Sequence, residues 1–259
     1  MPEAALQDVG VLVTRPRAQA AELVTAIEEH GGTAFCFPVI DIKALDTTVV
    51  SAAAAALPQP DIVIFISRNA VEYGLQYVSG GLIAAIGPAT AAAVEAAGHI
   101  VDIQSAGGYD SEHLLAEPEF QEVAGKEVRI IRGDTGRELL AQELAGRGAN
   151  VSYLSVYERR LPAVDAGMLA SLEARWRQGH IAVITVMSVQ SLHNLVRLLP
   201  DWCRQQLETT PLVTPAGRVL KEALDLYPAS RPILASGPQA DDMVQAIIAL
   251  HSTDFGHAP

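Results

Sequence analysis

The feature that most constrains the fold is an internal repeat. Residues 11–45 match residues 128–162 at a constant offset of 117 positions (11 to 128). The same residue type recurs at equivalent places in both copies: Arg15 and Arg132, Leu23 and Leu140, Gly31 and Gly148, and Val39 and Val156. Each copy begins with a short β-branched run, continues with helical periodicity and reaches a glycine typical of a helix C-terminus. Each copy therefore predicts strand, helix, glycine and strand.

More of the chain is duplicated. Three further pairs of segments match, the last more loosely: residues 61–75 with 182–196, 85–91 with 212–218, and 105–115 with 235–245. The second pair of segments aligns Pro88 with Pro215. Four repeat classes thus follow one another twice, which allows two lobes in tandem (residues 9–120 and 128–250). It equally allows the first repeat unit to complete a lobe with the last three.

Length and patterning predict an α/β protein of two lobes, each a parallel sheet flanked by helices. A chain of 259 residues suits two domains of about 100 to 150 residues, and strands alternate with helices along it. The longest nearly uncharged apolar run, residues 80–94, is interrupted by Gly87 and Pro88, so we predict no membrane span. Acidic residues occupy the N-terminus where a signal peptide would be basic, so we expect a cytoplasmic protein.

Charge and cysteine usage narrow the partners to a small molecule or nothing. A formal net charge of −12 disfavours nucleic-acid binding, which depends on phosphate neutralisation by Lys and Arg. Cys36 and Cys203 are isolated and no HxxxH or HxH spacing occurs, so we predict no metal site.

Small polar residues gather where predicted strands meet predicted helices: residues 14–15, 67–69, 87–90, 105–108, 132–137, 188, 214–215 and 236–238. Any one of them is read most simply as a helix N-cap. Together they suit an anionic ligand that carries many carboxylates or phosphates, because helix N-termini at a sheet's carboxyl edge present free N–H groups. No GxGxxG follows the first strand, residues 133–137 lack the lysine and length of a P-loop, and no GxSxG occurs. The residues alone leave the reaction open.

Several motifs resemble those of the uroporphyrinogen-III synthase family over essentially the whole chain. They are VLVTRP at 11–16, IFISRNAVE at 64–72, AIGPATAAAVEAAG at 85–98, GRELLAQELAGRGANVSYLSVYERR at 136–160 and SGP at 236–238. The resemblance implies one discontinuous lobe (1–37 and 162–259), a second lobe (44–155) and two connector strands (38–43 and 156–161).

The resemblance also implies an activity in porphyrin and heme biosynthesis. In this family the linear tetrapyrrole hydroxymethylbilane, which carries eight carboxylates, loses water and closes with its ring D inverted, without metal or organic cofactor. We therefore expect a monomeric lyase of this kind. One alternative is a noncatalytic two-lobed protein that binds or senses a small anion, and another is a nucleotide-sugar transferase, although no acidic metal motif supports the latter.

Site residues follow from the same resemblance. Tyr157 matches a tyrosine proposed to assist departure of the substrate hydroxyl, and the alternative is a connector tyrosine packed between lobes. Ser67 and Ser188 either hold pyrrole carboxylates or cap helices. The substrate-binding candidates are Arg15, Ser67, Gly87, Pro88, Thr90, Arg132, Arg137, Ser188, Thr214, Ser236 and Gly237. Residues 212–218 have Thr214 and Gly217 where the matching residues 85–91 have Gly87 and Thr90, which argues against a symmetric role for Thr90.

Overall fold

The duplicated sequence forms two parallel sheets with the same strand order. The computed structural model describes residues 4–105, 108, 110–135 and 138–254. Its contacts divide the chain into two compact units, unit 1 (Met1–Asp41 and Arg160–Pro259) and unit 2 (Ile42–Arg159). No helix among the described residues is both long enough and apolar enough to cross a membrane.

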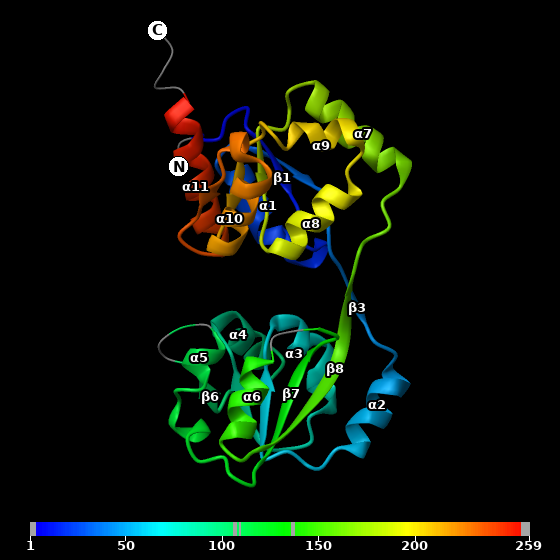
Figure 1. The fold of residues 1–259 in the computed structure, drawn as a ribbon, viewed down its shortest axis with the longest axis vertical. Helices are drawn as coiled ribbons and strands as arrows, with labels where there is room; N and C mark the ends of the chain where they lie inside the picture. Colours follow the sequence, from blue (N-terminus) through cyan, green and yellow to red (C-terminus); the bar gives the residue numbers. More distant parts are fainter. Residues whose placement is uncertain (1–3, 106–107, 109, 136–137, 255–259) are drawn as a thin grey trace. The chain divides into compact units, whose positions relative to one another are not determined.

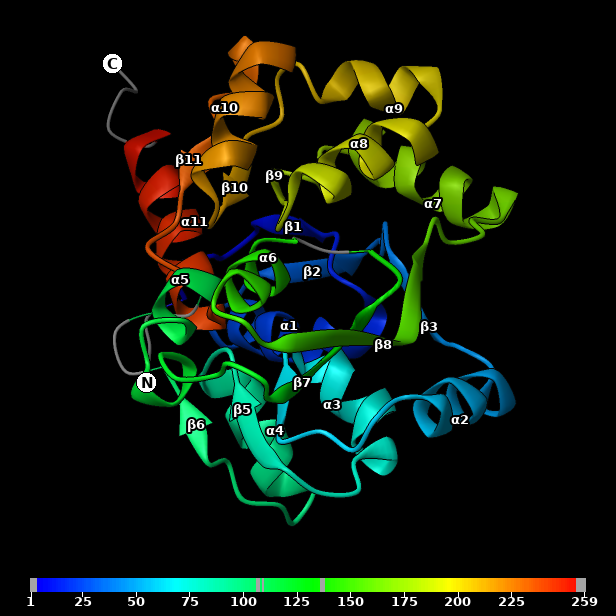
Figure 2. The ribbon, with the colours of Figure 1, turned by 60° about the horizontal axis from the view of Figure 1, so that its bottom comes forward.

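Unit 1 contains sheet A, in the order β11-β10-β9-β1-β2. Figure 1 labels β1, and Figure 2 labels all five strands. The strands of sheet A are β1 (Gly10–Val13), β2 (Thr33–Cys36), β9 (Val183–Thr185), β10 (Leu212–Thr214) and β11 (Ile233–Leu234). Every pairing in it is parallel. The first repeat unit thus forms one sheet with the last three, because β1 pairs with β9 as well as with β2.

Unit 2 contains sheet B, in the order β3-β8-β7-β4-β5-β6 (Figure 2). Its strands are β3 (Asp41–Ala44), β4 (Ile62–Phe65), β5 (Leu82–Ala85), β6 (Ile103–Gln104), β7 (Glu127–Gly133) and β8 (Asn150–Arg160). Neighbouring strands from β8 to β6 pair in parallel. Apart from the edge strand β3, each strand occupies the place that its repeat partner has in sheet A.

The two copies of the longest repeat agree residue by residue. The register of β1 on β2 pairs Gly10 with Thr33, and the register of β7 on β8 pairs Glu127 with Asn150, which are the positions 117 residues later. The intervening helices, α1 (Ala21–Glu29) and α6 (Leu139–Gly146), end at equivalent places. Gly31 and Gly148 follow them, each with φ of +85°, a left-handed conformation that a side chain would strain.

Helices cover both faces of each sheet. Unit 1 also has α7 (Ala166–Arg177), α8 (Val189–Leu198), α9 (Asp201–Gln206), α10 (Gly217–Leu226) and α11 (Ala240–Asp254); unit 2 has α2 (Thr47–Ala56), α3 (Arg68–Gly74), α4 (Pro88–Ala96) and α5 (Ser111–Leu114). In unit 2 the α5 and α6 side chains share one core with sheet B, and those of α2, α3 and α4 share the other. In unit 1 the cores of α1 and α11 pack on one face of sheet A. Near-continuous apolar strands are what such double coverage demands.

The predicted alignment of Pro88 with Pro215 is wrong by two positions. Pro88 is the first residue of α4, whereas Pro215 lies two positions before Gly217, the first residue of α10. By this structural alignment Thr90 corresponds to Val219, and both side chains are buried. Each segment has a proline near its helix start, but only Pro88 is the first helical residue.

The sequence predicts a strand at 100–103 and one extended segment at 35–42, and both differ from the observed strands. The first is reduced to β6, and Ile100 is 78% exposed, because β6 pairs only through Ile103 and Gln104 at the edge of the sheet. The extended segment expected after α1 is split into β2 and β3. Pro38, which has no backbone N–H to donate, lies in the gap between them.

Candidate active site

The predicted site residues of unit 2 lie at the carboxyl edge of sheet B. Ser67 follows β4, Gly87 follows β5, and Arg132 lies at the end of β7. Because neighbouring parallel strands end at one edge, the strand order places these residues along the same edge of the sheet, and Tyr157 lies on β8 two strands from β4. Arg137 lies outside the described residues.

A β-bulge turns the Tyr157 side chain. Along β8 the partners of Arg132 and Gly133 are Ser155 and Tyr157, so one residue, Val156, is skipped. Val156 and Tyr157 therefore both face the core beneath α2, α3 and α4, which simple alternation forbids. A Cβ on Gly133 would lie 2.7 Å from the Tyr157 ring, so only glycine leaves the ring its place.

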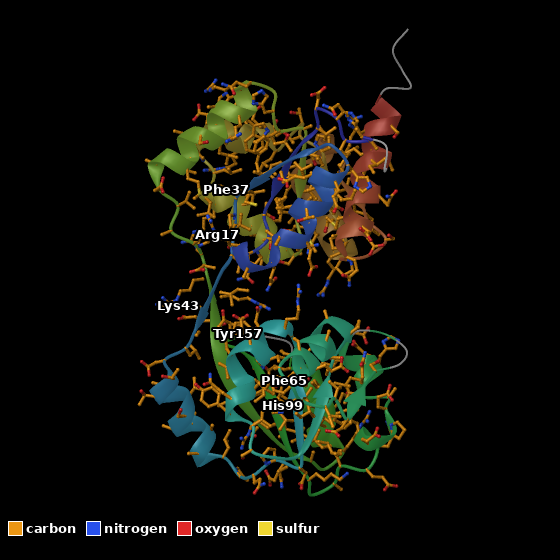
Figure 3. The ribbon with its side chains drawn as sticks, turned by 180° about the vertical axis from the view of Figure 1, so that it is seen from behind. Arg17, Phe37, Lys43, Phe65, His99 and Tyr157 are labelled. Atoms are coloured by element: carbon orange, nitrogen blue, oxygen red, sulfur yellow. The ribbon has the colours of Figure 1, made fainter. Side chains whose placement is uncertain are left out.

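The Tyr157 hydroxyl is tied to Ser67. The two hydroxyl oxygens are 3.2 Å apart, and Tyr157 is only 1% exposed. Figure 3 labels Tyr157 among the side chains of unit 2. Ser67 is the N-cap of α3, and its Oγ accepts the backbone N–H of Ala70 at 3.1 Å. A serine hydroxyl has one proton and two lone pairs, so after this bond Ser67 can still donate to, or accept from, the phenol. The Tyr157 ring also lies near Tyr73 and beneath the Arg159 guanidinium, 5.9 Å from its centroid.

Arg132 is engaged with Glu138 and Tyr153. Its Nη1 lies 3.0 Å from Glu138 Oε1, its guanidinium stacks 4.4 Å from the Tyr153 ring centroid, and the Tyr153 hydroxyl donates to Glu138 Oε2 at 2.6 Å. Burial and then the bond to Glu138 raise the pKa of Tyr153 to about 12. The bonds from Tyr153 and then Arg132 lower the pKa of Glu138. Sequence reasoning missed Glu138 and Tyr153, although both lie inside the GRELL…VSYLSVYERR motif.

In unit 1 the predicted site residues mostly form hydrogen bonds to other groups of the same unit. Arg15, which is 7% exposed, reaches from the end of β1 to the Pro238 carbonyl at 2.6 Å, beyond β11. Ser188 caps α8 and lies 2.8 Å from Ser191 Oγ. The buried Thr214 Oγ1 accepts the N–H of Ala216 at 3.3 Å, and Ser236 Oγ donates to Asp242 at 2.7 Å beside Gly237.

Thr90 and its neighbours complete the predicted set. Gly87 is the N-cap of α4 and Pro88 its first residue, where the missing proline N–H costs nothing. Thr90, in the first turn, is 5% exposed. Across the described ranges, no three His, Cys, Asp or Glu side chains are grouped so as to hold a metal ion.

Comparison with known proteins assigns the chain to a family. The family model described as uroporphyrinogen-III synthase HemD matches residues 21–245. The chain belongs to the uroporphyrinogen-III synthase family. It is 32% identical over 215 residues to the uroporphyrinogen-III synthase of Salmonella typhimurium, and 30% identical over 206 residues to that of Escherichia coli. Each alignment covers 76% of this chain and 82% of the relative.

Solved uroporphyrinogen-III synthases share the fold. The Helicobacter pylori structure aligns with a TM-score of 0.62 at 13% identity, covering 93% of this chain and 99% of the other. A mutant Thermus thermophilus structure aligns with a TM-score of 0.58 at 20% identity, covering 94% and 99%. The α/β class and the family resemblance inferred from the motifs are thereby confirmed.

Proposed function

We propose that the chain cyclises hydroxymethylbilane to uroporphyrinogen III, with loss of water and inversion of ring D. The observation that carries this proposal is the family match over residues 21–245, supported by relatives that are named for the activity. The alternative of a noncatalytic anion binder has no comparable support.

The protein needs to supply placement more than a strong nucleophile, because pyrrole rings are electron-rich. Holding ring D so that its substituted carbon attacks can contribute about 7 to 11 kcal/mol in favourable intramolecular cases. We assign the binding of substrate carboxylates to groups at the carboxyl edges of the sheets. They are Arg15, Ser67, Gly87, Pro88, Thr90, Arg132, Ser188, Thr214, Ser236 and Gly237. We add Arg137, which lies outside the described residues. Within this set Arg132 already holds Glu138, so it would offer a carboxylate only its remaining N–H groups.

Tyr157 is the proposed proton donor. As the bond between the hydroxymethyl carbon and its oxygen breaks, the phenol proton joins the departing hydroxyl and water leaves. Ser67 can then rotate its O–H toward the phenolate, because its Oγ still accepts from Ala70 and lies 3.2 Å away. The tetrapyrrole gives up one proton as the new carbon–carbon bond is completed, and this proton restores the phenol, so that the net change is the loss of one water. Ser67 would thus be a positioning residue that acts through Tyr157.

The activity is tested by supplying hydroxymethylbilane to the purified chain and measuring the ratio of isomers III and I. The substrate left alone closes without inversion to type I, so formation of type III above the buffer control supports the enzyme. Saturable binding of hydroxymethylbilane with only type I product would favour the noncatalytic binder.

We further propose that the enzyme acts as a cytoplasmic monomer without metal, organic cofactor or nucleic acid. The formal net charge of −12 supports the last point, since nucleic acid repels acidic surfaces. Light scattering should give a mass near 27.4 kDa, and turnover should survive dialysis against a chelator. A dimer, or activity restored only by added metal, would contradict these points.

A further inference from the structure

Arg129 is a buried charge in a place that the fold does not require to be charged. It lies on β7 and is 3% exposed, on the face of sheet B that carries Ile131 and α2. The equivalent residue 117 positions earlier is Leu12, which is fully buried on β1. The repeat therefore accepts an apolar side chain here, and the arginine is a particular feature of unit 2.

The Arg129 guanidinium is incompletely satisfied. Its Nη2 donates to the Pro58 carbonyl at 2.5 Å, while its Nε is buried without a hydrogen-bond partner. Within the described part of the chain, no carboxylate lies at ion-pair distance from it. Glu127, two residues earlier on the strand, attracts it electrostatically, but the Glu127 carboxylate accepts from Asn150. Burial of a guanidinium without an anion is unfavourable, so a site for an anion is the natural complement.

A pocket of about 290 Å³ adjoins this side chain. Its apolar wall comes from the end of α2 and Leu57, and its polar wall from Gln59, Tyr77 and Ser79. Gln59 and Ser79 are exposed, so the pocket opens to solvent. Because the lining residues precede β4 and β5, the pocket lies at the amino edge of sheet B, roughly 13 Å along four-residue strands from the carboxyl edge.

We propose that this pocket binds a small carboxylate, with Arg129 as the anion-binding group and Leu57 and the alanines of α2 against a short aliphatic chain. The planar guanidinium fork matches a carboxylate, which can accept two N–H groups at once. Inorganic phosphate shares the charge but not the apolar chain, so it serves as the competing ligand. The site is separate from Tyr157 and does not depend on the proposed reaction.

The test is a nuclear magnetic resonance titration of the arginine Nε–H signals in the full chain, using sodium butyrate, sodium acetate and inorganic phosphate. Sodium chloride at equal ionic strength is the salt control. Arg147, which donates to the Leu115 and Phe120 carbonyls, is the matched internal control. We expect a saturable shift of the Arg129 signal that is strongest with butyrate. The Arg147 signal should shift no more with these ligands than it does with sodium chloride.

Two variants complete the test. Arg129→Leu copies the residue of unit 1, and Arg129→Lys retains charge without the fork. Butyrate should raise the unfolding temperature of the wild type beyond the chloride control, since a ligand of the native state stabilises it, and this rise should vanish in Arg129→Leu. If Arg129→Leu does not fold, the wild-type titration and the Lys variant decide. A wild-type shift that merely tracks ionic strength, or saturable binding that persists in Arg129→Leu, would overturn the proposal; a preference for phosphate would overturn its aliphatic part.

Discussion

The two units use the same strand order but place different groups at the carboxyl edge. Ser67 and Ser188 stand after equivalent strands, and each caps its helix through an N–H bond of 3.1 Å. In unit 2 the serine hydroxyl is also hydrogen-bonded to the Tyr157 hydroxyl, whereas in unit 1 it is hydrogen-bonded to the Ser191 hydroxyl. The position 117 residues before Tyr157 is Ile40, a buried aliphatic residue. The scaffold is thus duplicated while the ionisable group is not, which points to unit 2 for proton transfer.

The two units also differ in the strand that follows the helix of the longest repeat. In the second copy β8 runs unbroken through 11 residues, whereas in the first copy β2 and β3 belong to different sheets. Pro38 lies in the gap of the first copy, and Ser155 is its equivalent inside β8. Because β8 is continuous, it can contain the bulge that turns the Tyr157 side chain toward Ser67.

The largest expected effect is on fragments of the chain. Residues 44–155 contain β4 to β7, the first six residues of β8 and the helices α2 to α6, so we predict that they unfold cooperatively on heating. Residues 1–120 lack β9, the second partner of β1, and also β10 and β11, so we predict that they do not. Calorimetry or circular dichroism of both fragments is the measurement. Cooperative unfolding of 1–120 together with a molten 44–155 would favour a tandem arrangement.

Exchanging serine and proline at the equivalent positions 155 and 38 should have the next largest effect on stability. Ser155→Pro puts a fixed φ and a missing N–H inside β8, between β7 and β3, and should destabilise the protein by on the order of 3 kcal/mol or more. The matched Pro38→Ser, at a position already outside any strand, should change stability by less than about 1 kcal/mol. Urea unfolding compares them, and equal losses would show that the two positions are not under different constraints.

Much of this comparison was accessible from the sequence, because the repeat copies carry the same periodicity and capping residues. The alternation of strands and helices, the family and the cap at Ser67 follow from short-range patterns and motif matches. The bulge at Val156 could not be predicted from the sequence. It is defined by how β8 pairs with β7, where Val156 has no partner. The contacts of Arg132 and Arg129 depend on segments distant in sequence, such as Tyr153 and Pro58, which no local pattern brings together.

The two capping serines offer an internally controlled test in the enzyme. Ser67→Ala and Ser188→Ala should each cost about 1 kcal/mol of stability through loss of the cap. Only Ser67→Ala should lower kcat, by roughly 10- to 100-fold, since it also removes a hydrogen bond to a developing phenolate. Ser188→Ala should act on KM. In a cycle with Tyr157→Phe the effect of Ser67→Ala on kcat should disappear; equal falls of kcat in both serine variants would reduce Ser67 to a cap.

The smallest expected effect is the pH dependence of the cluster formed by Arg132, Glu138 and Tyr153. The pKa of Tyr153 is raised to about 12, so its stabilising contribution is complete below pH 10 and is lost as the pH rises toward 12. The pKa of Glu138 is lowered from 4.5, so its contribution is present above that value and is lost as the pH falls through the lower one. The stability difference between wild type and Tyr153→Phe should therefore shrink at both extremes in urea unfolding. A difference independent of pH would show that the cluster acts only by packing.

The central claim, that Tyr157 supplies the proton while other groups bind and orient the substrate, is tested most directly by single-turnover kinetics of Tyr157→Phe. The variant keeps the ring and its packing against Gly133 but lacks the donor. General-acid catalysis usually contributes about 10²- to 10⁴-fold, so the rate should fall by that factor. The product formed on the enzyme, corrected for the spontaneous reaction, should remain isomer III, because Ser67, Thr90 and Ser188 are unchanged. A normal rate would contradict the account and leave Tyr157 a packing residue of β8.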